Sequence, residues 1–130
     1  MPLIVEERGT PTATALWDGA DRVATVRLTH VEAHAALTQA ARLGRLTRAQ
    51  RARARSNLTE LLENLDWLEV DPDLMSAASG LAEEHALRAY DAVHLAAAER
   101  LATDEVVLAA GDRAMLSAAR DRGLSTASIG

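Results

Sequence analysis

The sequence contains no cysteine, no phenylalanine and no lysine. Without cysteine the chain has no disulfide, no thiol nucleophile and no thiolate ligand for zinc, which leaves hard cations that prefer oxygen ligands. Aromatic residues are also scarce, because Trp17, Trp67 and Tyr90 are the only ones. We expect the tryptophans in the core or in a dimer interface, and little stacking on nucleobases.

Long apolar runs are absent as well. No segment approaches the roughly 18 uninterrupted apolar residues of a membrane span, and the first residues lack the basic start and long apolar stretch of a signal peptide. We therefore expect a cytoplasmic protein without membrane contact. With 130 residues, 48% of them hydrophobic, the chain is expected to form a single globular domain over residues 1–130.

The basic residues are distributed unevenly. The net charge of −5 argues against general adhesion to nucleic acid, yet six arginines fall between Arg42 and Arg55 without an intervening acid. Arg48, Arg51 and Arg55 would share one side of a helix that begins near Thr47. Because guanidinium groups match phosphate geometry, we expect these three to contact the phosphate backbone of a nucleic acid, the alternative being a solvated helix face.

Short apolar segments alternate with helical patterns along the chain, which indicates a parallel α/β domain. The helix predicted over residues 91–98 is apolar almost all round and must be central and buried. The other predicted helices cover residues 11–18, 29–44, 47–65, 72–82 and 112–122, and the predicted strands cover residues 23–26, 67–70, 105–110 and, at the sheet edge, 124–129.

Three acidic residues, Glu32, Asp91 and Asp112, each follow a strand or loop and open an apolar helix. In a parallel sheet with right-handed crossovers such helix starts meet at one edge, where open α/β sheets bind ligands. Carboxylates gathered there repel one another, and Mg²⁺ or Mn²⁺ relieves that repulsion. A cation held there can activate water and stabilise the charge that develops on a phosphodiester.

Each acid also has a purely structural explanation. Glu32 could reach back to the amide of Thr29 in a capping box, and Asp112 could cap the last helix. Asp91 is harder to explain this way, because the rest of its helix is apolar and an ionised carboxylate is costly to bury. The free amides and dipole of the helix start compensate for that cost only in part.

Two histidines lie one helical turn apart, His30 and His34. Glu32 lies between them in sequence and would point elsewhere, so it does not complete a site with them. We expect solvent exposure or helix packing for both rings rather than metal ligation.

Three segments, Leu28–Ala33, Leu87–Ala96 and Val106–Asp112, together resemble PIN-domain ribonucleases, especially the toxins of VapBC-type toxin–antitoxin modules. The likeness covers nearly the whole chain. It implies a three-layer α/β/α fold with a short, mostly parallel sheet. It also implies a Mg²⁺- or Mn²⁺-dependent endoribonuclease with Glu32, Asp91 and Asp112 as metal ligands, a homodimer, and neutralisation by a small antitoxin protein.

The chain departs from this family at its start. The family usually begins with a central strand that ends in Asp, whereas residues 2–9 resemble only the segment after that strand. We therefore expect the first central strand and its ligand to be absent, as in a chain truncated at its N-terminus. Ala110 also replaces a common hydroxyl residue near Asp112.

Other functions are compatible with this departure. The main alternative is a catalytically weakened or inactive PIN-like protein that serves as an antitoxin-binding or self-association module. A phosphoacceptor or phosphatase α/β domain is disfavoured, because no Asp-x-Asp pair follows a first strand.

Overall fold

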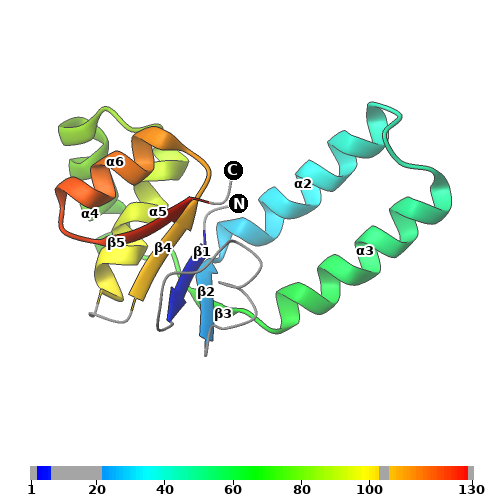
Figure 1. Ribbon diagram of the computed structural model, residues 1–130, viewed down its shortest axis with the longest axis horizontal. Helices are drawn as coiled ribbons and strands as arrows, with labels where there is room; N and C mark the ends of the chain where they lie inside the picture. Colours follow the sequence, from blue (N-terminus) through cyan, green and yellow to red (C-terminus); the bar gives the residue numbers. More distant parts are fainter. Residues whose placement is uncertain (1–2, 7–21, 103–105, 129–130) are drawn as a thin grey trace.

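The computed structural model describes residues 3–6, 22–102 and 106–128 (Figure 1). The helix predicted over residues 11–18 lies outside this part of the chain. The elements are, in order, β1 (Leu3–Glu6), β2 (Arg22–Val26), α2 (Leu28–Arg42), α3 (Arg48–Glu63), β3 (Asp66–Leu68), α4 (Pro72–His85), α5 (Ala89–Arg100), β4 (Val106–Ala110), α6 (Arg113–Asp121) and β5 (Ser125–Ser128).

The five strands form one sheet in the order β3-β2-β1-β4-β5. The pairs β2–β3 and β4–β5 are parallel, whereas β1 is antiparallel to both of its neighbours, β2 and β4. Four strands therefore run one way, and the expected mostly parallel α/β sheet is confirmed. One correction applies: the central position expected to lack a strand is filled by β1, which satisfies strand edges that would otherwise be unpaired.

The direction of β1 decides which end of it meets the strand ends of β2 and β4. Leu3 pairs with Ala109, near the end of β4, whereas Glu6 pairs with Arg22 and Val106, the first residues of β2 and β4. The acid of β1 thus lies at the opposite edge from the helix starts that come after β2 and β4.

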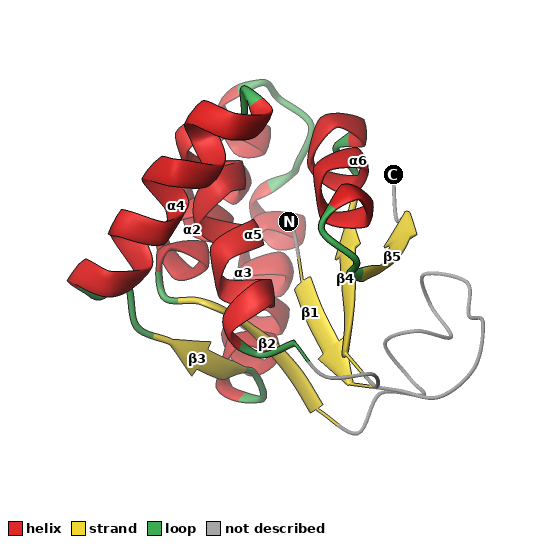
Figure 2. Ribbon diagram, turned by 90° about the vertical axis from the view of Figure 1, so that its left-hand side faces the viewer, coloured by secondary structure: helices red, strands yellow, loops and turns green. Residues whose placement is uncertain are grey.

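Residues of the strands alternate between two apolar layers, as the pleat requires. Ala24, Val26 and Leu108 face the larger core, which α4, α5 and α6 complete on one side of the sheet (Figures 1 and 2). Val23 and Ala109 face the other side, where the end of α3 packs against them. Helices therefore cover both faces, as expected for a three-layer arrangement.

Helix α5 is the most deeply buried helix, and every residue from Asp91 to Ala98 is buried. It packs against α4 and α6 and against β2 and β4. The predicted central helix is thereby confirmed. Its burial fixes the position of its first turn relative to the ends of β2 and β4.

Helices α2 and α3 form a hairpin that extends away from the sheet (Figure 1). Gly44, with a φ of +71°, allows the chain to leave α2 in the left-handed region. Thr47 then caps α3 as predicted, in a capping box with Gln50. In the described part of the chain, no helix has both the length and the apolar character needed to cross a membrane.

Candidate active site

Asp91 is the third residue of α5 and is only 7% exposed. Arg88 occupies the N-cap position of this helix and makes no side-chain capping bond. The Asp91 carboxylate instead accepts a hydrogen bond from Arg88, with 3.2 Å between Nε and Oδ2. Asp91 is therefore not at the capping position, and its burial is compensated by a cationic side chain.

Asp112 caps α6, as predicted, and its two carboxylate oxygens have different partners. Oδ1 accepts from the backbone N–H of Met115 at 2.8 Å. Oδ2 accepts from Nη2 of Arg88 at 3.3 Å. One oxygen therefore serves the helix while the other faces the same guanidinium as Asp91.

Arg88 brings the two aspartates together. Its guanidinium contacts carboxylates that begin two different helices, α5 and α6. The Arg88 side chain is 80% exposed, whereas those of Asp91 and Asp112 are 11% and 34% exposed, so an open guanidinium covers two partly shielded carboxylates. A divalent cation bound by both aspartates would have to displace this guanidinium.

The predicted capping box at Thr29 is wrong. Helix α2 already begins at Leu28, with Arg27 at its N-cap, so Thr29 lies inside the helix. Its buried hydroxyl instead lies 2.7 Å from that of Thr25 and 3.1 Å from that of Tyr90. Because Thr29 is occupied in the core, Glu32 is not bound to its helix start.

Glu32 lies beside Tyr90, which links it to the two aspartates. The pKa of the Tyr90 hydroxyl is raised first by burial, then by its hydrogen bond to the Glu32 carboxylate, and further by the charge of Asp91. A tyrosine hydroxyl is protonated at neutral pH, so Tyr90 can donate to Glu32. The three predicted acids thus border one group of side chains that comes from α2, α5 and α6.

The donor set of this acidic site, Glu32, Asp91 and Asp112, suits Mg²⁺ or Mn²⁺, because both prefer carboxylate oxygens. Among the described residues, no three Asp, Glu or His side chains yet stand around a single point at ligand distances. Asp91 and Asp112 are instead both in contact with the guanidinium of Arg88. The residues therefore fit a hard cation in chemistry, with Arg88 as its competitor.

Two members of the site were not identified from the sequence, Arg88 and Tyr90. Both precede Asp91 in the Arg-x-Tyr-Asp segment that carried part of the family likeness. The helical spacing of Arg88 and Asp91, three residues apart, was the available signal. No spacing rule connects Arg88 with Asp112 or Tyr90 with Glu32, because those contacts join different elements.

The three arginines expected to bind RNA lie on one surface of α3. Arg48, Arg51 and Arg55 line an open hollow together with Ser56 and Thr59. All three arginines are exposed. This surface, the arginine face, lies on the hairpin, and α3 begins at the end of the hairpin farthest from the sheet (Figure 1).

Comparison with known proteins agrees with the geometry. The family model described as PIN domain matches residues 3–121. Ribonuclease VapC45 from Mycobacterium tuberculosis (strain CDC 1551 / Oshkosh) is 36% identical over 125 residues, which cover 96% of this chain and 87% of the relative. Ribonuclease VapC49 from M. tuberculosis (strain ATCC 25618 / H37Rv) has the same identity and coverage.

Proposed function

Because the chain belongs to the PIN-domain family, we propose that it is a metal-dependent endoribonuclease that acts as the toxin of a toxin–antitoxin module. The observation that supports this most directly is the shared contact of Arg88 with Asp91 and Asp112. Two acids that begin different helices thereby contact the same guanidinium. The relatives named as ribonucleases favour this function over a non-catalytic binding module.

In this proposal Glu32, Asp91 and Asp112 hold Mg²⁺ or Mn²⁺. When bound, such an ion supplies an activated water and neutralises charge on the phosphodiester. With the carboxylates bound to such an ion, the exposed side chain of Arg88 would be free to contact an RNA phosphate.

Tyr90 acts as a positioning residue in the same site. Its hydroxyl is protonated at neutral pH and would donate a hydrogen bond to Glu32. Thr29, bonded to both Tyr90 and Thr25, holds that hydroxyl from the side of the sheet. Glu32 would therefore be oriented by the partly buried hydroxyl of Tyr90 rather than by its own helix start.

The arginine face extends RNA binding beyond the acidic site. Arg48, Arg51 and Arg55 would bind phosphates through charge and shape, because few aromatic side chains exist for stacking. The partners in this proposal are an RNA substrate, a small antitoxin and a second copy of the chain in a homodimer. Action on cellular RNA would take place in the cytoplasm.

The test is the substitution Asp91→Asn, which keeps the size of the side chain and removes its charge. We expect Mg²⁺-dependent RNA cleavage to fall roughly 100-fold or more, the order seen when one electrostatic group of an active site is removed. The melting temperature should change little, because Asn can still accept from Arg88.

The matched control is Asp121→Asn, which makes the same change at the exposed end of α6. It should cleave RNA like the unaltered protein. Undiminished cleavage by Asp91→Asn, measured on a labelled RNA with and without Mg²⁺, would remove Asp91 from the proposed site.

A further inference from the structure

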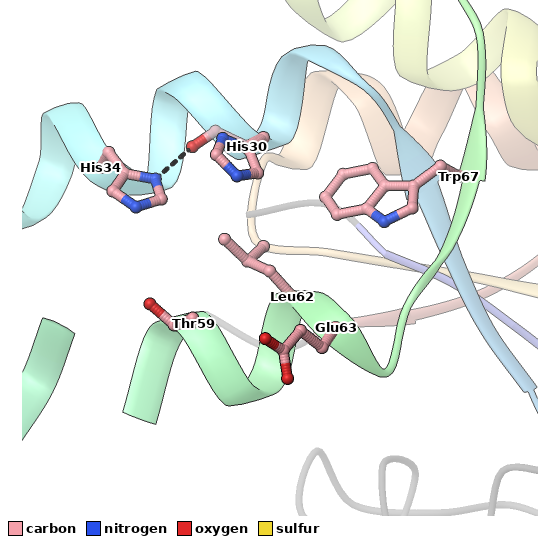
Figure 3. Close-up of a pocket in the computed structure, with 6 residues that line it drawn as sticks. All are labelled: His30, His34, Thr59, Leu62, Glu63 and Trp67. Atoms are coloured by element: carbon pink, nitrogen blue, oxygen red, sulfur yellow. Dashed lines mark hydrogen bonds between the residues drawn. The ribbon is translucent and has the colours of Figure 1, made fainter. Parts of the chain in front are cut away.

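A pocket of about 310 Å³ lies between the two helices of the hairpin, near its base (Figure 3). His30 and His34 of α2 form one wall, and Thr59, Leu62 and Glu63 of α3 form the other. Trp67 of β3 closes one end. None of these residues belongs to the acidic site.

The two histidines are arranged as a pair. They are four residues apart on one helix face, and their rings stack with centroids 4.7 Å apart and an interplanar angle of 25°. Both rings extend from α2 toward α3 (Figure 3). Histidines with this spacing on a helix are a known arrangement for binding one metal ion.

A backbone hydrogen bond leaves His34 ready to act as a ligand. Its Nδ1 lies 2.8 Å from the carbonyl oxygen of His30, so this nitrogen carries the proton and donates. The lone pair is then on Nε2. Histidines that ligate metals usually have such an outer hydrogen bond, which fixes both the tautomer and the ring orientation.

Across the pocket, Glu63 offers a carboxylate with no hydrogen bond or ion pair to any described residue. Its exposed side chain is free to turn toward the imidazoles. As the described side chains stand, no three His, Asp or Glu residues are placed where they could hold a metal ion together. Two imidazoles are in place, and the carboxylate has to rotate to join them.

We propose that His30, His34 and Glu63 bind a transition-metal dication of the zinc or nickel type at the base of the hairpin. Two imidazoles and one carboxylate are ligands that Zn²⁺ and Ni²⁺ accept, and Mg²⁺ binds imidazole poorly. The ion would join α2 to α3. It would hold the hairpin, which carries the arginine face, at a fixed angle to the sheet.

This site can be tested through Trp67, whose ring centroid lies 6.1 Å from that of His30. A Trp17→Phe background leaves Trp67 as the only tryptophan. In millimolar Mg²⁺, included to saturate the proposed acidic site, titration with Ni²⁺ should quench the Trp67 fluorescence with a saturable curve. Zn²⁺ should reverse the quenching by competition and raise the melting temperature by several degrees.

Variants then assign the ligands. His34→Gln and His30→Gln should each weaken Ni²⁺ affinity at least roughly tenfold, the lower end of the loss seen for outer hydrogen-bond partners of ligands. Glu63→Gln should weaken it as well. Glu83→Gln, the same change at an exposed position of α4, should leave it unaltered.

Two results would overturn the inference. Ni²⁺ affinity unaltered by His34→Gln would show that the histidine pair is not the site. An equal loss in Glu83→Gln and Glu63→Gln would remove Glu63 from the ligand set. Because the measurement needs neither RNA nor cleavage, its failure is separate from failure of the nuclease proposal.

Discussion

At the scale of single residues, Arg88 pairs with two carboxylates that begin different helices, Asp91 and Asp112. Asp91 and Asp112 would repel if left alone, and the guanidinium between them removes that repulsion. The same contact makes Arg88 a competitor for any cation that enters. In the proposed nuclease, Arg88 would therefore link the affinity for metal with the affinity for RNA.

Arg88→Gln should strengthen binding of Mn²⁺ roughly two- to fivefold, since each exposed ion pair that the metal must displace is worth at most about 1 kcal/mol. The same change should weaken RNA binding and lower its salt slope by about one phosphate contact. Titration calorimetry with Mn²⁺, and RNA binding at several salt concentrations, measure the two effects.

The control is Arg120→Gln on α6, at an exposed arginine outside the acidic site. It should alter neither Mn²⁺ affinity nor the salt slope. Weaker Mn²⁺ binding by Arg88→Gln would mean that Arg88 supports the metal instead of competing with it.

His94 is a second residue with a measurable consequence. It is fully buried beside the Tyr90 ring, and neither ring nitrogen has a hydrogen-bond partner among the described residues. Burial lowers the pKa of His94 from its ordinary value of 6.5 to about 4. The folded protein therefore holds this ring neutral.

We expect the free energy of unfolding to fall as the pH drops from about 6.5 to about 4, because the unfolded chain takes up a proton that folded His94 refuses. Across this pH range, proton uptake by His94 in the unfolded chain should lower the free energy of unfolding by roughly 3 kcal/mol. His94→Leu should remove it and flatten the pH dependence, as followed by urea unfolding at several pH values. Parallel curves for the two proteins would contradict this assignment.

At the scale of elements, capping residues predicted the helix starts well where the side-chain oxygen of the capping residue is available to the first amides of the helix. Thr47 and Asp112 cap α3 and α6 as expected, and Asp71 caps α4 through the amide of Leu74. Thr29 does not cap α2, because its hydroxyl bonds to Thr25 and Tyr90 in the core. A capping residue predicted from sequence therefore fails to cap its helix where its side-chain oxygen forms tertiary hydrogen bonds instead.

Asp112 serves both its helix and the acidic site, and two substitutions separate these roles. Asp112→Ala should lower the free energy of unfolding by about 1 kcal/mol through loss of the cap. Asp112→Asn should retain most of that stability, because Asn caps helices well. Both variants should lose most Mn²⁺-dependent cleavage.

Thermal unfolding and cleavage assays on the two variants give the comparison. Full cleavage activity in Asp112→Asn would restrict Asp112 to a structural role. Equal stability of Asp112→Ala and the unaltered protein would mean that the cap contributes nothing measurable.

At the scale of the whole molecule, the overall negative charge and the local arginine face oppose each other. The net charge of −5 repels RNA at long range, whereas Arg48, Arg51 and Arg55 present positive charge on one helix. Binding should therefore depend on that face and decline steeply with salt.

The double charge reversal Arg48→Glu with Arg51→Glu should weaken RNA binding and reduce its salt slope by about two phosphate contacts. Arg51→Glu alone should have a smaller effect in the same direction. Arg120→Glu, an identical change on α6, serves as the control and should cost little. A salt slope unaltered by the double variant would assign the arginine face to ordinary solvation.

The sequence alone determined the α/β class, the buried α5 and most helix starts, and it led to the proposal of Glu32, Asp91 and Asp112 as site residues. These features depend on local periodicity and capping, which are set by neighbours in the chain. Only the tertiary structure decided the direction of β1, the contact of Arg88 with both aspartates, and the pocket that His30, His34 and Glu63 share. Each joins segments distant in sequence, and strand pairing and side-chain packing between elements choose such contacts without a local signal.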